Sequence, residues 1–129
     1  MLDIAVLTGE YAVCRLPAGS ALPPTLAGDL SGDDVVTVSW TADGLSVICP
    51  ADRVPEQAAV ETVWRCLRVA GPLDVAVTGT LASLVGPLAE ARVSVVAFST
   101  YDTDYLLVPT VLLGEATTAL QRAGHHVLS

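Results

Sequence analysis

Two carboxylates, Asp102 and Asp104, lie close together in a polar segment that separates two apolar runs. A pair of carboxylates can perform acid–base chemistry or bind Mg²⁺. Hydrolytic pairs need a defined separation around the bound substrate, and Mg²⁺ needs further oxygen ligands. The sequence offers no third group whose spacing converges on these two residues. We therefore expect a binding site here, and a protein that is not an enzyme.

The histidines and cysteines do not have the spacing of a metal site. His125 and His126 are adjacent, and neighbouring residues of a strand point to opposite faces, so we expect two surface histidines and no shared metal. Cys14, Cys49 and Cys66 are well separated, lack a CxxC spacing and lie in apolar runs, which predicts buried free thiols. We expect neither a metal nor a cofactor.

The charge balance limits the kinds of partner. Fourteen acidic residues against six basic ones give a net charge of −8, whereas nucleic acid is normally bound through clustered Lys and Arg. The 129 residues are 52% hydrophobic and 16% charged, which indicates a globular domain. The longest apolar runs are too short to span a bilayer, and the first residues lack a signal-peptide pattern. We expect a cytoplasmic protein that binds neither nucleic acid nor membrane.

A weak internal repeat relates the two halves of the chain at an offset of 59 residues. It places Thr41–Pro50 on Thr100–Pro109 without gaps, and Thr, Asp and Pro coincide. At this offset Asp43 matches Asp102, which predicts that the Asp102 side chain caps its own turn. Asp104 has no acidic counterpart in the first copy and is therefore the better candidate for a ligand contact.

The second copy predicts the order β-α-β-β-α-β. Alternating apolar residues, helical i, i+3, i+4, i+7 spacing and a hydroxyl-rich turn define its elements. They are a strand at Leu73–Thr78, a helix at Leu81–Arg92, strands at Val93–Phe98 and Asp104–Val108, a helix at Leu113–Ala123 and a strand at His125–Leu128. Pro87 must kink the first helix or begin a second segment, because it lacks an N–H and its ring clashes with the carbonyl four residues back.

The first copy predicts the same order with shorter helices. Its elements are a strand at Tyr11–Leu16, a helical turn near Leu22–Ala27, strands at Val35–Trp40 and Leu45–Cys49, a short helix near Glu56–Val63 and a strand at Arg65–Val69. Leu2–Thr8 is an additional strand that the repeat does not explain. The prediction is an α+β protein of two tandem ferredoxin-like βαββαβ repeats, residues 1–70 and 71–129, with antiparallel sheets and helices on one face.

Several motifs resemble an ACT domain of the CASTOR-like group. They include Gly79-Thr-Leu-Ala-Ser-Leu84, Pro87-Leu-Ala-Glu-Ala91 and Ser99-Thr-Tyr-Asp-Thr-Asp-Tyr105, of which the last is the most specific. Thr41–Pro50 and Trp64–Thr78 resemble the first half of small bacterial proteins in this group that carry two ACT repeats and nothing else. The resemblance covers essentially the whole chain and implies the tandem ACT fold.

The resemblance also implies a regulatory ligand site, because ACT domains pair their sheets side by side and hold an amino acid at the interface. Carried onto this sequence, the ligand-contacting positions are Thr100, Tyr101 and Asp104, with Gly79 opposite. Gly79 precedes a helix, where the N–H groups of Thr80 and Leu81 suit a carboxylate. The glycine equally suits a tight turn that needs a positive φ. Asp104 is the residue expected to contact the ligand's ammonium group or cationic side chain.

Two function classes stay open. The first is an amino-acid-binding sensor that acts through a regulated protein, and the acidic surface and Asp104 favour a cationic or neutral amino acid as its ligand. The second is a structural ACT-like interaction module without a ligand. Because exposed sheet edges commonly pair, we expect an internally paired tandem that is able to form a homodimer. We expect Trp40 and Trp64 to be buried at one of these surfaces.

Overall fold

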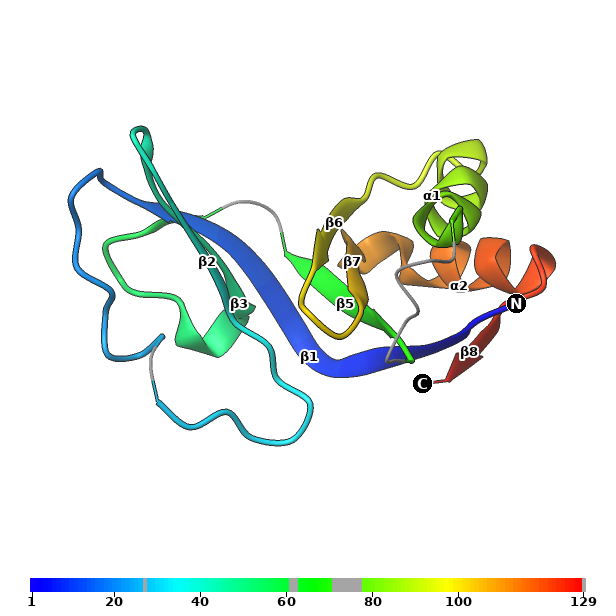
Figure 1. Ribbon diagram of the computed structural model, residues 1–129, viewed down its shortest axis with the longest axis horizontal. Coiled ribbons are helices and arrows are strands. Elements are labelled where there is room, and N and C mark those ends of the chain that lie inside the picture. The colour runs from blue at the N-terminus through cyan, green and yellow to red at the C-terminus, as the bar shows by residue number, and fades with distance from the viewer. Residues whose placement is uncertain (27, 61–62, 71–77, 129) are drawn as a thin grey trace. The chain divides into compact units, whose positions relative to one another are not determined.

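The computed structural model describes residues 1–26, 28–60, 63–70 and 78–128. They form two compact units (Figure 1). The helical unit combines Met1–Leu7 with Arg65–Ser129, and the strand unit, Thr8–Trp64, is inserted between them in the sequence. These units differ from the expected halves 1–70 and 71–129, because the first strand enters both units and the strand expected to close the first half lies in the helical unit.

The helical unit is an α+β arrangement with two α-helices. Its elements are the beginning of β1 (Asp3–Leu16), β5 (Trp64–Val69), α1 (Thr80–Glu90), β6 (Val96–Ser99), β7 (Asp104–Pro109), the 3₁₀ turn Thr110–Leu112, α2 (Leu113–Arg122) and β8 (His126–Leu128). The strand order is β8-β1-β5-β7-β6, with β6 and β7 antiparallel and β8 parallel to β1. The N-terminal strand, which the repeat left unexplained, therefore lies between β5 and β8.

Both helices of this unit contribute to one buried cluster with the strands. It contains Ile4, Leu67, Val69, Leu84, Leu88, Val93, Leu106, Val108, Ala116 and Leu120. Leu84 and Leu88 are one helical turn apart on α1, as the apolar stripe predicts. Alternation along β7 directs Leu106 and Val108 towards the helices and Tyr105 towards the opposite face. The helices thus pack on one face of the sheet, as expected.

Helix α1 runs from Thr80 to Glu90 with Pro87 inside it. Because proline has no N–H, the carbonyl of Ser83, four residues earlier, lacks its intrahelical partner. The Nε2 atom of His125 lies 2.9 Å from this carbonyl oxygen and supplies the missing hydrogen bond. The Pro87 position is therefore accommodated within one helix by a donor from the end of the chain, and no second segment begins there.

The end of α1 explains why the next strand begins later than expected. Arg92 has a φ of 61°, and the Val93 N–H donates to the Leu88 carbonyl at 2.9 Å, which together close the helix. The expected strand Val93–Phe98 is therefore shortened at its start to β6. Farther along, β7 and α2 match the expected elements Asp104–Val108 and Leu113–Ala123 to within one residue. The expected strand Leu73–Thr78 lies, except for Thr78, outside the described residues.

The strand unit is an antiparallel arrangement in the order β2-β3-β1-β4. Its elements are the rest of β1, β2 (Thr37–Thr41), β3 (Gly44–Pro50), the 3₁₀ turn Ala51–Arg53 and β4 (Ala59–Val60). One face of these strands contributes to a buried cluster of Cys14, Leu16, Leu26, Leu45, Val47 and Cys49. In the described part of this unit no α-helix forms, in contrast to the helical unit.

The helical elements expected in the strand unit are corrected. The expected helical turn Leu22–Ala27 is reduced to a turn in which the Leu26 N–H donates to the Pro23 carbonyl at 3.0 Å; residue 27 lies outside the described ranges. The expected helix Glu56–Val63 is wrong, since a turn is followed by strand β4 over its described residues. Pairing of β4 with β1 decides the conformation here over the local helical pattern.

Strand β1 joins two expected strands, Leu2–Thr8 and Tyr11–Leu16, into one of 14 residues. Gly9, between them, has a φ of 78°, a conformation that glycine adopts without steric cost. The strand therefore continues through Gly9, where the sequence pattern predicts a gap between two strands. This continuity is what carries one strand through both compact units.

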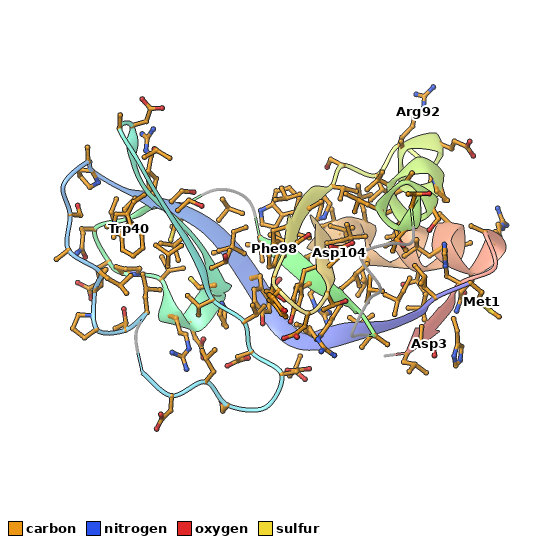
Figure 2. All side chains as sticks on the ribbon, viewed as in Figure 1. Met1, Asp3, Trp40, Arg92, Phe98 and Asp104 are labelled. Atoms are coloured by element: carbon orange, nitrogen blue, oxygen red, sulfur yellow. The ribbon has the colours of Figure 1, made fainter. Side chains whose placement is uncertain are left out.

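The remaining expectations concern cysteine, tryptophan and membrane spans. The three cysteines are buried and form no disulfide bonds, which confirms the prediction of buried thiols. Trp40, expected to be buried, is 65% exposed on β2 (Figure 2), whereas Trp64 is half-buried. In the part of the chain that the structure describes, the helices are too short to cross a bilayer, which takes about 20 apolar residues.

Candidate ligand-binding site

The first part of the candidate site is the hairpin between β6 and β7. Ser99 and Asp104 form the last pair of this ladder, and the Ser99 hydroxyl donates to Oδ1 of Asp104 at 2.5 Å. The carboxylate is partly exposed, and its second oxygen forms no hydrogen bond within the described structure. Asp104 is therefore a carboxylate oriented by a neighbouring hydroxyl and still able to accept from a cation.

The turn of this hairpin is closed by threonine. The Oγ1 atom of Thr100 accepts from the N–H of Asp102 at 3.3 Å and from the N–H of Thr103 at 3.4 Å. The Thr100 N–H donates to the Thr103 carbonyl at 2.9 Å. The expectation that the Asp102 side chain caps the turn is therefore corrected: Thr100 makes these bonds, and Asp102 is exposed.

The same turn hydrogen bond occurs in the hairpin between β2 and β3. The Thr41 Oγ1 accepts from the Asp43 N–H at 3.2 Å and donates to the Gly44 carbonyl at 3.3 Å. The residues that coincide in the internal repeat thus have matching roles in the two units. Threonine closes both turns, because its Oγ1 reaches the backbone two residues along the chain.

The rest of the β6–β7 hairpin is anchored to β5 on one side and open on the other. The buried Thr103 hydroxyl donates to the Val69 carbonyl at 2.7 Å. Tyr101, at the tip, is fully exposed. Behind Asp104, the rings of Phe98 and Tyr105 stack with centroids 5.1 Å apart. This combination places a large aromatic side chain and a carboxylate on a hairpin whose turn is held against β5.

The second part of the candidate site is the N-terminus of α1. Gly79 has a φ of 81° and gives the helix no side-chain cap, so its positive φ satisfies the turn interpretation. A Cβ on Gly79 would meet no atom within 4 Å, so the backbone there is open to approach. The N–H groups of Thr80 and Leu81 belong to the first helical turn, where no intrahelical acceptor exists. This helix end can therefore accept an anion such as a carboxylate.

The two parts of the site share one side of the sheet in the helical unit. By alternation, Asp104 lies on the same face as Leu106 and Val108, which is the face that α1 covers. No hydrogen bond joins the described Gly79–Leu81 segment to the hairpin. The site is thus two separate polar features, one suited to an anion and one to a cation.

Sequence reasoning missed the role of His125, which was expected at the surface and is buried. Its Nδ1 atom accepts from the Leu2 N–H at 3.1 Å, while Nε2 bonds the Ser83 carbonyl. These partners require a neutral ring with its proton on Nε2. The signal was present in Pro87, which leaves the Ser83 carbonyl without a partner. His126, in contrast, is exposed and lies 3.4 Å from Asp3, as expected for a surface histidine.

The titratable groups elsewhere do not suggest a reactive centre. Among the described residues, no group of three or more His, Cys, Asp or Glu side chains is arranged to bind a metal. Burial, together with charge repulsion from and hydrogen bonding to the neighbouring Cys14 thiol, raises the pKa of Cys49 to about 12. Burial also raises the pKa of Cys14 above its ordinary value. Both thiols are therefore protonated and inert at neutral pH.

Family models match both parts of the chain. The model for the ACT domain matches residues 59–122, a range that contains all six candidate ligand contacts. The chain contains an ACT domain. A second model, which describes an N-terminal domain, matches residues 9–57, within the strand unit. The ACT domain match thus covers most of the continuous part of the helical unit.

Curated relatives include the cytosolic arginine sensor for mTORC1 subunit 1 of Homo sapiens and Bos taurus. Each is 36% identical over 74 residues, which are 57% of this chain and 22% of the relative. The chain therefore spans about a fifth of the length of the curated relatives it matches. The similarity concerns one part of the sensor, and does not extend to its whole architecture.

Solved structures are similar over nearly the whole chain. Protein Atu0741 of Agobacterium tumefaciens is 32% identical, with a TM-score of 0.87 over 98% of this chain and 92% of that one. The regulatory subunit of aspartate kinase from Thermus flavus has a TM-score of 0.63 at 8% identity, over 93% of this ACT-domain chain and 95% of that one. At that identity the second likeness shows the fold alone.

Proposed function

We propose that this ACT-domain protein is a cytoplasmic, non-enzymatic regulator that binds an amino acid and acts on a further protein. The observation that carries the proposal is the Asp104 carboxylate, oriented by Ser99 and partly exposed, on the same sheet face as the uncapped N-terminus of α1. An amino acid offers the complementary pair of charges. Its carboxylate suits the α1 N-terminus, and its cationic group suits Asp104.

We further propose that the ligand is a cationic amino acid such as arginine. The curated relatives are arginine sensors by name, and the net charge of −8 favours cations over anions in the surrounding field. In this proposal the N–H groups of Thr80 and Leu81 hold the carboxylate beside Gly79. Thr100, Tyr101 and Asp104 contact the other end. The ligand lies at an interface between two tandem ACT repeats, and the protein is able to form a homodimer.

A structural module without a ligand is the second candidate. Two observations favour it: Tyr101 is fully exposed, and β6 is at the end of the strand order in its unit. An exposed edge strand with an aromatic residue at its tip can pair with another sheet. In that case the β6–β7 hairpin mediates association with another sheet, and the Asp104 charge keeps the exposed edge strand soluble.

A thermal-shift screen against the common amino acids separates the two candidates. A ligand present at 100 times its dissociation constant stabilises the folded state by about 2.7 kcal/mol, which raises the unfolding temperature measurably. We expect arginine or lysine to raise it and glutamate to leave it unchanged. A protein whose unfolding temperature is the same with every amino acid is the structural module.

A further inference from the structure

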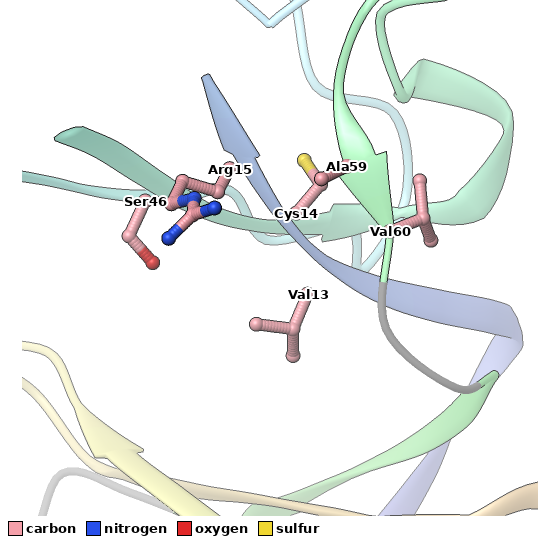
Figure 3. Close-up of a pocket in the computed structure, with 6 residues that line it drawn as sticks. All are labelled: Val13, Cys14, Arg15, Ser46, Ala59 and Val60. Carbon is pink, nitrogen blue, oxygen red and sulfur yellow. The ribbon is translucent and has the colours of Figure 1, made fainter. Parts of the chain in front are cut away.

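The exposed face of the strand unit presents an arginine between two neighbouring strands. In the register of β1, Arg15 is paired with Ser46 of β3 on one side and with Ala59 of β4 on the other. Residues paired across a ladder point to the same face. The preceding residue, Cys14, points the other way, into the buried cluster (Figure 3). Arg15 therefore lies at the middle of an exposed row that crosses the sheet.

Arg15 differs from the arginines that serve the fold. The guanidinium groups of Arg53 and Arg65 donate to backbone carbonyls, and that of Arg68 donates to Tyr105. Among the described residues, Arg15 forms no hydrogen bond or ion pair. Its Cγ and Cδ atoms lie 3.4 and 3.5 Å from the place that a Cβ on Gly44 would occupy. The stem thus lies against the β2–β3 turn while the charged head stays without a partner.

Two adjacent cavities of the strand unit share Arg15 and Ala59. One has a volume of about 270 Å³ and is lined also by Val13, Cys14, Ser46 and Val60. The other has a volume of about 340 Å³ and is lined also by Pro17, Asp43 and Gln57. Small-molecule sites begin at about 300 Å³. Together the two cavities are therefore large enough for a compact ligand that spans both.

The chemistry of the two cavities is complementary to a zwitterion. Asp43 and Arg15 line the same cavity but do not form an ion pair, so a cation and an anion each remain available to a ligand. The Ser46 hydroxyl lies beside the guanidinium in Figure 3, where it can donate to a carboxylate that Arg15 binds with two parallel N–H groups. Val13, two residues before Arg15 on the same face of β1, supplies apolar surface at the other end.

We propose that this face is a second ligand site, which binds a zwitterionic amino acid with a small aliphatic side chain. Arg15 and Ser46 hold its carboxylate, Asp43 accepts from its ammonium group, and Val13 contacts its side chain. The net charge of −8 disfavours multiply charged anions such as phosphates at the same place. The site lies wholly in the strand unit and uses none of the residues of the hairpin proposed above.

The test is an NMR titration of the full chain with L-valine, following backbone amide signals. We expect saturable shifts at Arg15, Ser46 and Asp43. Arg15→Gln should weaken binding at least tenfold, because it removes a charge-assisted pair, and Arg15→Lys should weaken it less, since the charge remains. Arg122→Gln is the matched control: it removes an exposed arginine of the helical unit and should leave the affinity unchanged.

Two valine analogues check the division of roles. 3-Methylbutanoate lacks the ammonium group and isobutylamine lacks the carboxylate, so each should bind more weakly than valine, and only isobutylamine should be insensitive to Arg15→Gln. The absence of saturable shifts, or equal valine affinity in Arg15→Gln and Arg122→Gln, overturns the proposal. Asp104→Asn should leave valine binding intact. Loss of arginine binding in Asp104→Asn therefore tests the hairpin proposal separately, and either proposal can fail alone.

Discussion

The β2–β3 and β6–β7 hairpins share a turn and differ in the pair that follows it. Thr41 and Thr100 make the same turn bond. At the offset of the repeat, Val47 and Cys49 match Leu106 and Val108, and all four are in the buried cluster of their own unit. The two hairpins therefore match in the positions that they bury as well as in sequence.

The pair next to the turn breaks this correspondence. Trp40 is paired with Leu45 in the first hairpin, whereas Ser99 is paired with Asp104 in the second. Leu45 is 1% exposed and part of the core. Asp104, at the matching position, is a partly exposed carboxylate that accepts from Ser99. The two hairpins show that one backbone design can support a core position in one copy and a polar position in the other.

The largest expected effect comes from moving the carboxylate to the first hairpin. Leu45→Asp places an unpartnered charge in the strand-unit core and should lower the free energy of unfolding by about 3–5 kcal/mol. Urea unfolding measures the change. Ser46→Asp, one residue along on the exposed face, is the control and should change stability by no more than about 0.5 kcal/mol. Similar losses in both variants would mean that the two faces of β3 are not distinct.

The next effect concerns ligand affinity at the second hairpin. Asp104→Asn removes the charge from the hydrogen bond to the ligand, which contributes about 1.5–3 kcal/mol, so binding of a cationic amino acid should weaken roughly tenfold or more. Calorimetric titration measures it. Asp102→Asn should leave the affinity nearly intact, because its carboxylate is exposed and outside the proposed site. Equal losses would show that the two carboxylates act together, and unchanged binding in Asp104→Asn would move the site elsewhere.

A smaller effect tests the feature that the hairpins share. Thr41→Val and Thr100→Val each remove the oxygen that accepts from the turn backbone and should each cost about 1 kcal/mol of unfolding free energy. Serine at either position keeps the hydroxyl and should retain most of the stability. Chemical denaturation of the four variants gives the comparison. If only one of the two substitutions to valine lowers the free energy of unfolding, the two turns share a geometry but contribute unequally to stability.

A last effect, confined to alkaline pH and absent at neutral pH, distinguishes the two cores. The Cys49 pKa is about 12 in the folded protein, against an ordinary 9.0. The unfolded chain therefore loses this proton first, so the stability linked to Cys49 is intact below pH 9 and is lost between pH 9 and about 12. Cys49→Ala should make stability less dependent on pH in that window, as unfolding curves at several pH values can measure. An identical dependence in both proteins would place Cys49 in contact with water.

The elements that the sequence predicted well are those determined by short-range signals. The hairpin between β6 and β7 follows from alternation and from the threonine-rich turn, and α2 follows from its apolar spacing. The oriented carboxylate at Asp104 was found because the repeat supplied Leu45 as a contrast. The hydroxyl that orients it was not predicted, because the pairing of Ser99 with Asp104 depends on the register of the ladder.

The features that the sequence did not predict depend on contacts between distant residues. Strand β4 replaced an expected helix because it pairs with β1, some 44 residues earlier in the register of Arg15 and Ala59. The two units likewise differ from the expected halves because Asp3, Ile4 and Ala5 pair with β8, far along the sequence, which places Met1–Leu7 in the helical unit. Local periodicity carries no information on such pairings.

The position of His125 has a consequence for the order in which this protein folds. The ring contacts the Ser83 carbonyl in α1 and the Leu2 N–H, which is 123 residues away in sequence. Until His125 reaches α1, only water can hydrogen-bond the Ser83 carbonyl. Contacts between residues so far apart in sequence form more slowly than those within a hairpin or a helix, because the loop-closure entropy is lost before the contact is gained. The hydrogen bonding of α1 is therefore completed late in folding, when His125 reaches the Ser83 carbonyl.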